Sequence, residues 1–151
     1  MTINVDERLR ADYRALREGL GAVEVDRDVV AASGPDTVEY LQGQLSQDVA
    51  ALTVGGSAWS LLLAPQGKVD ARLRVTRTGP DAFVLDVDGG WGEAVVARLA
   101  RFRLRSKVEL TALPWRCLAL RGPGVVGLDR AAAGGAVAGG AGGPGAGGAG
   151  G

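Results

Sequence analysis

The chain has 151 residues, of which 46% are apolar, and it carries 17 basic and 17 acidic side chains. This length and composition are sufficient for one domain with a buried core, and the zero net charge indicates neither DNA nor an anionic membrane as a partner. The absence of histidine excludes a Ser-His-Asp triad. The single cysteine, Cys117, excludes an internal disulfide and argues against a metal site.

The N-terminus is acidic and polar, whereas a signal peptide begins with a cationic segment and an apolar run. The longest apolar stretch, around residues 61–64, is too short to cross a bilayer. A lone cysteine is typical of a reducing compartment. We therefore expect a cytoplasmic protein.

The first third of the chain predicts a helix, one or two strands and a second helix. Residues 6–20 have helical composition, and the valine-rich residues 23–32 predict one or two short strands. Pro35 and Asp36 are typical of a helix N-terminus. The buried face of this second helix would consist of Val38, Leu41 and Leu45.

The middle of the chain predicts a hairpin. Residues 57–64 favour a strand, and residues 65–67 favour a turn. Residues 68–76 then alternate between apolar and charged side chains, which is typical of a half-buried strand, and residues 83–88 run back from a turn. One face would carry Val69, Ala71, Leu73 and Val75, and the other Lys68, Asp70, Arg72, Arg74 and Thr76.

The last elements are a helix over 91–102 and two strands over 107–113 and 115–120. Trp91 would pack at the start of the helix. The predicted fold is α+β, a mostly antiparallel sheet with packed helices. Residues 131–151 contain only Gly, Ala, one Val and one Pro. We expect a flexible tail there, either a natural low-complexity linker or a product of a shifted reading frame.

Three segments carry a family resemblance. They are Gly34–Val49, with Tyr-Leu-Gln-Gly-Gln followed by Ser-Gln-Asp-Val; Pro65–Val75, with Gly-Lys and Leu-Arg; and Phe102–Val108, with Arg-Ser-Lys-Val. In order and spacing they resemble YgfZ-type folate-binding proteins, relatives of the glycine-cleavage aminomethyltransferase. The resemblance covers residues 22–124. It implies a partial aminomethyltransferase-like folate-binding domain over 22–124. Composition adds a helical segment over 1–21 and a low-complexity Gly/Ala-rich tail over 125–151.

The resemblance implies a folate-binding accessory protein, associated with iron–sulfur cluster assembly or repair and with tRNA modification. Tetrahydrofolate would be its cofactor, in a cavity shared with domains beyond residue 124, and iron–sulfur client proteins would be its partners. The family's downstream K-G-C-[YF]-x-G-Q-E signature is absent from this sequence. The alternatives are a folate-dependent one-carbon transferase and a non-functional truncated product.

The candidate folate-binding residues are Gln44, Trp59, Lys68 and Arg72. Trp59 matches an aromatic folate contact of the aminomethyltransferase, and its alternative role is core packing beside Leu61 and Leu63. Lys68 and Arg72, with Arg74, could bind folate carboxylates or form a solvated face. Gln44 could line the cavity; alternatively, Gln44 and Asp48 could bond to the backbone.

Catalysis is not expected, because an alignment on Gly67 and Leu73 places the family's catalytic Asp pair at Ala71 and Arg72. Asp70 would pair with Arg72 or Lys68 instead, and could replace Ala71 only through a β-bulge. Five cations crowd the following segment: Arg98, Arg101, Arg103, Arg105 and Lys107. We expect a solvated helix end there rather than an RNA site.

Overall fold

The structure is a computed structural model, and it describes residues 6–126. The predicted tail over 131–151 lies outside the described residues, so its flexibility stays a prediction. The chain divides into two compact units, Met1–Val23 with Leu120–Gly151, and Glu24–Ala119.

The first unit contains helix α1 (Glu7–Glu18), where a helix was predicted. Asp6 caps it, because its carboxylate accepts a hydrogen bond from the backbone N–H of Arg8 at 3.3 Å. All residues of α1 are exposed. Gly122 has a φ of +116°, and the N–H of Gly124 donates to the carbonyl of Gly19 at 2.9 Å.

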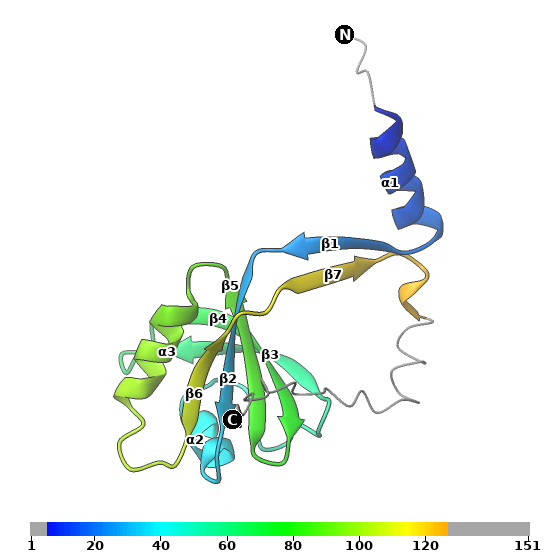
Figure 1. Cartoon of the computed structure of the whole chain (residues 1–151). Helices are drawn as coiled ribbons and strands as arrows, with labels where there is room; N and C mark the ends of the chain where they lie inside the picture. The colour runs from blue at the N-terminus through cyan, green and yellow to red at the C-terminus, as the bar shows by residue number, and fades with distance from the viewer. Residues whose placement is uncertain (1–5, 127–151) are drawn as a thin grey trace, which may run out of the picture. The chain divides into compact units, whose positions relative to one another are not determined.

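The second unit is built on a five-stranded antiparallel sheet with the order β3-β4-β5-β2-β6 (Figure 1). The strands are β2 (Arg27–Ser33), β3 (Ser57–Leu63), β4 (Val69–Gly79), β5 (Ala82–Asp88) and β6 (Glu109–Leu113). Two helices belong to this unit, α2 (Thr37–Gln42) and α3 (Gly92–Arg101). The predicted α+β class with a mostly antiparallel sheet is confirmed.

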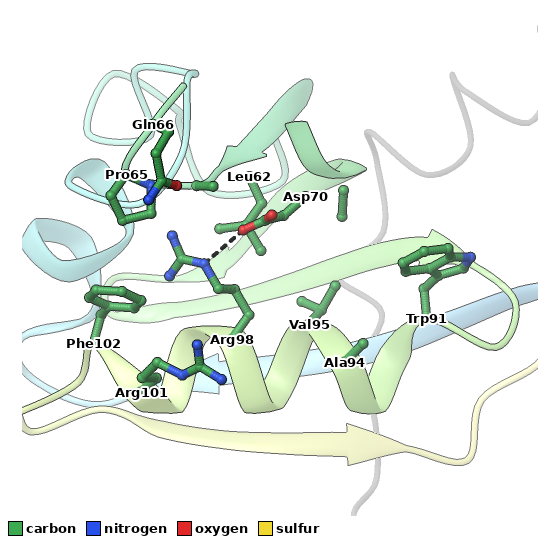
Figure 2. A pocket seen from close by; sticks show the side chains of 12 residues that line it. Leu62, Pro65, Gln66, Asp70, Trp91, Ala94, Val95, Arg98, Arg101 and Phe102 are labelled. Atoms are coloured by element: carbon green, nitrogen blue, oxygen red, sulfur yellow. Dashed lines mark hydrogen bonds and ion pairs between the residues drawn. The ribbon is translucent and has the colours of Figure 1, made fainter. Parts of the chain in front are cut away.

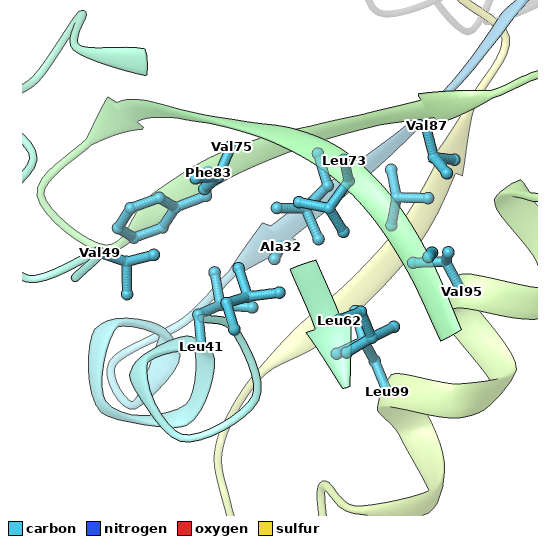
Figure 3. Packing of buried hydrophobic residues seen from close by; sticks show 14 of the residues in the cluster. Ala32, Leu41, Val49, Leu62, Leu73, Val75, Phe83, Val87, Val95 and Leu99 are labelled. Carbon is cyan, nitrogen blue, oxygen red and sulfur yellow. The ribbon is translucent and has the colours of Figure 1, made fainter. Parts of the chain in front are cut away.

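The core lies between one face of this sheet and the two helices (Figure 3). Leu73 and Leu85 come from the sheet, Leu41 from α2 and Leu99 from α3, and each is fully buried. Burial of one such side chain contributes about 1.5–3 kcal/mol. The alternation in residues 68–76 therefore identified the inward side of β4 correctly from Ala71 onward.

Helix α2 is shorter than the sequence predicted. It ends at Gln42, whose side-chain Oε1 accepts hydrogen bonds from the N–H groups of Val49 and Ala50 at 2.9 and 3.1 Å. Leu45 is buried as expected, but it lies beyond the helix and forms an isolated bridge with Leu62. The Gln42 side chain thus stabilises a turned segment where a longer helix was expected.

Helix α3 begins against a carboxylate from β2. Asp28 Oδ2 accepts a hydrogen bond from the N–H of Gly92 at 2.7 Å. A Cβ at Gly92 would lie only 2.8 Å from the Cβ of Asp28, so this close approach requires glycine. Trp91 is 53% exposed, so the prediction that it packs at the helix start is wrong.

The last predicted strand is β7 (Cys117–Arg121), and it does not join the main sheet. It pairs with β1 (Gly21–Val25) in a separate two-stranded sheet. The valine-rich segment over 23–32 therefore supplies two strands that belong to different sheets.

Candidate functional site

Trp59 lies on the sheet face opposite the core. Its neighbours on β3, Ser60 and Leu62, are buried, whereas Trp59 is 52% exposed. Successive side chains of a strand point to opposite faces, so Trp59 points away from the core. The core-packing alternative for Trp59 is therefore wrong.

Two guanidinium groups lie close to the Trp59 ring. The guanidinium carbon of Arg72 lies 4.3 Å from the ring centroid, and that of Arg27 lies 5.7 Å from it. Both distances are within the range of cation–π attraction. Arg74 is the direct cross-strand partner of Trp59. Three cations thus gather around one exposed aromatic ring.

Arg27 is held rigidly by β5. Its Nε and Nη2 donate to Asp86 Oδ1 at 3.0 and 2.7 Å, and Nη2 also donates to the Asp86 carbonyl at 2.9 Å. A further ion pair joins Arg27 to Asp88.

Burial raises the pKa of the nearby Cys117 thiol, and the charge of Asp86 raises it further.

We call this group of side chains the Trp59 patch, and it consists of Arg27, Trp59, Arg72, Arg74, Asp86 and Asp88. With three arginines and two aspartates, the patch has a net charge of one positive unit beside an exposed ring. An anionic ligand with a flat aromatic part fits this arrangement. Sequence reasoning gave Arg27 no role, although a cation within a valine-rich strand was an available signal.

The structure brings together only two of the four predicted binding residues, Trp59 and Arg72. Gln44 is half-buried and lines a hollow on the helix side of the sheet, with Arg98 and Phe102. Lys68 is exposed and precedes β4. A bulge between Lys68 and Arg72 interrupts the alternation, so the expected row of three cations is reduced to Arg72 and Arg74.

The bulge changes the direction of Asp70. Leu62 pairs with Ala71, but Leu63 pairs with Val69, which leaves Asp70 as the extra residue of β4. Its Oδ2 accepts a hydrogen bond from Arg98 Nε of α3 at 2.8 Å, on the helix side of the sheet (Figure 2). The predicted pairing of Asp70 with Arg72 or Lys68 is therefore wrong.

The same contact corrects the prediction for Arg98. Its side chain is only 15% exposed, and Nη2 donates to the Leu63 carbonyl at 2.7 Å. Arg98 is thus a packed residue, whereas a solvated helix end was expected. Asp48 has the alternative, backbone-bonding role, because its Oδ1 accepts a hydrogen bond from the N–H of Ala51 at 3.3 Å.

Comparison with known proteins identifies the family. A sequence model of the GCVT N-terminal domain matches residues 3–128. The chain is 38% identical over 99 residues to an iron–sulfur cluster assembly factor IBA57 homologue, mitochondrial, of Mycosarcoma maydis, a match that covers 58% of this chain and 25% of that protein. It is 31% identical over 111 residues to an aminomethyltransferase of Bordetella avium, a match that covers 72% of this chain and 30% of that protein.

Two further relatives agree with these. The chain is 32% identical over 85 residues to the tRNA-modifying protein YgfZ of Photorhabdus laumondii, a match that covers 56% of this chain and 26% of that protein. The crystal structure of the glycine cleavage system aminomethyltransferase T from Bartonella henselae superposes with a TM-score of 0.71 at 27% identity, over 82% of this chain and 34% of that one.

The chain spans a quarter to a third of the length of these relatives. Within residues 6–126, no helix is long and apolar enough to cross a membrane. The family match extends over most of the sequence, and the fold agrees with it. The chain belongs to the GCVT N-terminal domain family, and it is similar to the N-terminal portion of YgfZ-type and aminomethyltransferase-like proteins.

Proposed function

We propose that this chain is a folate-binding module of a protein that serves iron–sulfur cluster assembly or tRNA modification, and that it acts by binding rather than by catalysis. The relatives named for iron–sulfur cluster assembly and for tRNA modification support this role. The single observation that carries the proposal is the exposed Trp59 ring with the guanidinium groups of Arg27 and Arg72 close to it. Iron–sulfur client proteins as partners and a cytoplasmic location belong to the same proposal.

The Trp59 patch fits the chemistry of a folate. A pterin is flat and aromatic, so it can stack on an indole ring or on a guanidinium plane. The glutamate carboxylates of a folate can form paired hydrogen bonds with an arginine. In this assignment Trp59 binds the aromatic part and Arg72 binds a carboxylate, while Arg27 is fixed by Asp86 and supplies positive charge.

The patch is an open face and not an enclosed cavity, since Trp59 is 52% exposed. Small-molecule sites usually cover most of the ligand's surface. We therefore expect this chain to bind tetrahydrofolate weakly, with a Kd above about 100 μM, because a loss of about 3 kcal/mol lowers affinity more than a hundredfold.

A calorimetric titration with tetrahydrofolate tests the proposal, with Trp59→Ala and Trp91→Ala as a matched pair of exposed tryptophans. Trp59→Ala should abolish measurable binding, whereas Trp91→Ala, on the helix side of the sheet, should bind as the unchanged chain does. Low-micromolar binding would show that residues 6–126 hold a complete site. Equal binding by both variants would exclude the Trp59 patch as the folate site.

A further inference from the structure

Opposite the Trp59 patch, on the helix side of the sheet, a hollow lies between α3 and the turn that precedes β4, next to the hollow that Gln44 lines (Figure 2). Its volume is about 450 Å³, which is within the range of small-molecule sites. Leu62, Ala71 and Val95 form an apolar floor, and these three residues also belong to the core. The hollow therefore has a packed floor and does not depend on mobile side chains for its shape.

Aromatic rings stand at both ends of the hollow. Trp91 lies before the first residue of α3 and Phe102 after its last one, and both rings line the hollow (Figure 2). Trp91 is 53% exposed although α3 is otherwise well packed through Val95 and Leu99. An exposed indole at the rim of an apolar hollow can bind the flat part of a ligand.

Arg98 supplies a fixed cation in the wall of this hollow. Asp70 holds its Nε, the Leu63 carbonyl holds its Nη2, and its guanidinium carbon lies 4.1 Å from the centroid of the Phe102 ring. Its Nη1 is buried and has no hydrogen-bond acceptor among residues 6–126. A buried donor without a partner is costly, so an acceptor oxygen brought by a ligand would be stabilising there.

The charges around the hollow favour a single negative charge on the ligand. Arg98 and Arg101 are cations and Asp70 is the anion among the lining residues, which leaves one excess positive charge. Arg101 is exposed at the rim of the hollow. A carboxylate presents two oxygens in a plane, which suits a guanidinium better than a single acceptor does.

We propose that this hollow is a binding site for a small carboxylate with a flat apolar body, such as an aromatic acid. The carboxylate lies between Arg101 and Arg98, and the apolar body covers the floor toward Trp91. Arg101 is the exposed contact for the carboxylate, which reaches the buried Nη1 of Arg98 only when neighbouring side chains of the hollow move aside. This site is separate from the Trp59 patch and does not depend on the proposed folate role.

The test is a titration of the ¹⁵N-labelled chain with 3-phenylpropanoate, followed by NMR at the indole N–H groups. The chain has three tryptophans. Trp91 is the reporter and Trp115 is the internal control, while a shift at Trp59 would report the separate Trp59 patch, which also suits an aromatic anion. The Trp91 signal should shift with a Kd of about 1–5 mM, as expected for a ligand of this size, and the Trp115 signal should not move. The uncharged 3-phenylpropan-1-ol should bind at least about threefold more weakly.

Two pairs of variants place the ligand in the hollow. Ala94 lines the hollow and Ala97 lies elsewhere on α3, and both are exposed. Ala94→Leu should weaken binding at least about fivefold by filling the site, whereas Ala97→Leu should leave it unchanged. Arg101→Gln should weaken it about threefold and Arg105→Gln, the same charge change outside this hollow, should not. An unmoved Trp91 signal at 20 mM (about four times the highest expected Kd), or equal affinity for the alcohol, would overturn the proposal. So would equal effects of the paired variants.

Discussion

The guanidinium group of Arg72 lies 4.3 Å from the centroid of the Trp59 ring, and both side chains stand on the sheet face that points away from the core. They come from neighbouring strands, β3 and β4, and the register that pairs Trp59 with Arg74 places Arg72 diagonally across from the ring. This pair is the part of the predicted folate site that the fold brings together, and its contribution can be separated from that of the neighbouring cation.

The first prediction concerns Arg72→Ala. It should weaken tetrahydrofolate binding about fivefold, because it removes a partly exposed cation that can bind a glutamate carboxylate. Arg74→Ala, on the same strand face, should have a smaller effect, since Arg74 is not the guanidinium placed over the Trp59 ring. Calorimetric titration with tetrahydrofolate measures both. Tighter binding by Arg72→Ala would mean that Arg72 competes with the pterin for the ring.

The second prediction concerns Arg77, which ties a loop to the sheet. Its Nη1 donates to the Leu52 carbonyl at 2.8 Å, and its Nη2 donates to the Pro80 carbonyl at 2.6 Å. Its guanidinium carbon also lies 5.5 Å from the centroid of the Phe83 ring. Arg77→Ala should lower the free energy of unfolding by about 2–3 kcal/mol, because hydrogen bonds from a charged donor are lost together.

Urea denaturation measures this loss, with Arg105→Ala as the control. Arg105 is exposed, and its replacement should change the free energy of unfolding by less than about 0.5 kcal/mol. A similar small change for Arg77→Ala would show that these carbonyls are satisfied equally well by water.

The third prediction concerns Tyr40, whose ring is buried and whose hydroxyl donates to the Leu99 carbonyl of α3. Tyr40→Phe should lower the free energy of unfolding by about 1 kcal/mol at neutral pH, since the carbonyl loses its donor in the core. Tyr13→Phe, on the exposed α1, is the control and should have no measurable effect.

Tyr40 should also make stability depend on pH in the alkaline range. Burial raises the pKa of Tyr40 above its ordinary value of 10.0. The unfolded chain therefore loses this proton at a lower pH than the folded chain does, so the stabilisation is fully present below pH 10 and is lost as the pH rises through the folded pKa. Denaturation midpoints measured from pH 8 upward should fall less steeply in Tyr40→Phe than in Tyr13→Phe. If the midpoints of the two variants fell equally with pH, Tyr40 would not be the source of the pH dependence.

The alternation in residues 68–76 was sufficient to predict a half-buried strand with Leu73 and Val75 inside, because each residue's direction depends only on its neighbours in the chain. The bulge at Asp70 was not predictable in this way. It arises from the pairing of Leu63 with Val69, a relation between two strands. The sequence also did not determine which face of the sheet Trp59 lies on, since the run Leu61–Leu63 is apolar on both faces of β3.

Arg98 shows the same limit. In the sequence it belongs to a row of cations, and a solvated helix end is the ordinary meaning of such a row. Its partner Asp70 is 28 residues away in the chain, and only the bulge turns that carboxylate toward α3. The partner of β7 was also beyond local reasoning, because β1 lies at the other end of the chain.

The last prediction is that this chain does not catalyse aminomethyl transfer. The alignment on Gly67 and Leu73 puts the family's catalytic Asp pair at Ala71 and Arg72. Ala71 faces the core and has no titratable group, and Arg72 is a permanent cation over the Trp59 ring, which can neither accept a proton nor stabilise a cationic intermediate. The nearest carboxylate in sequence, Asp70, is directed to the opposite side of the sheet and paired with Arg98.

A transfer assay with the lipoyl carrier protein and tetrahydrofolate should therefore give the rate of the protein-free reaction. Asp70→Asn and Glu93→Gln, which each remove one carboxylate near α3, should leave that rate unchanged. Turnover that disappears in Asp70→Asn but persists in Glu93→Gln would show that Asp70 acts as the base, and the chain would then be a one-carbon transferase.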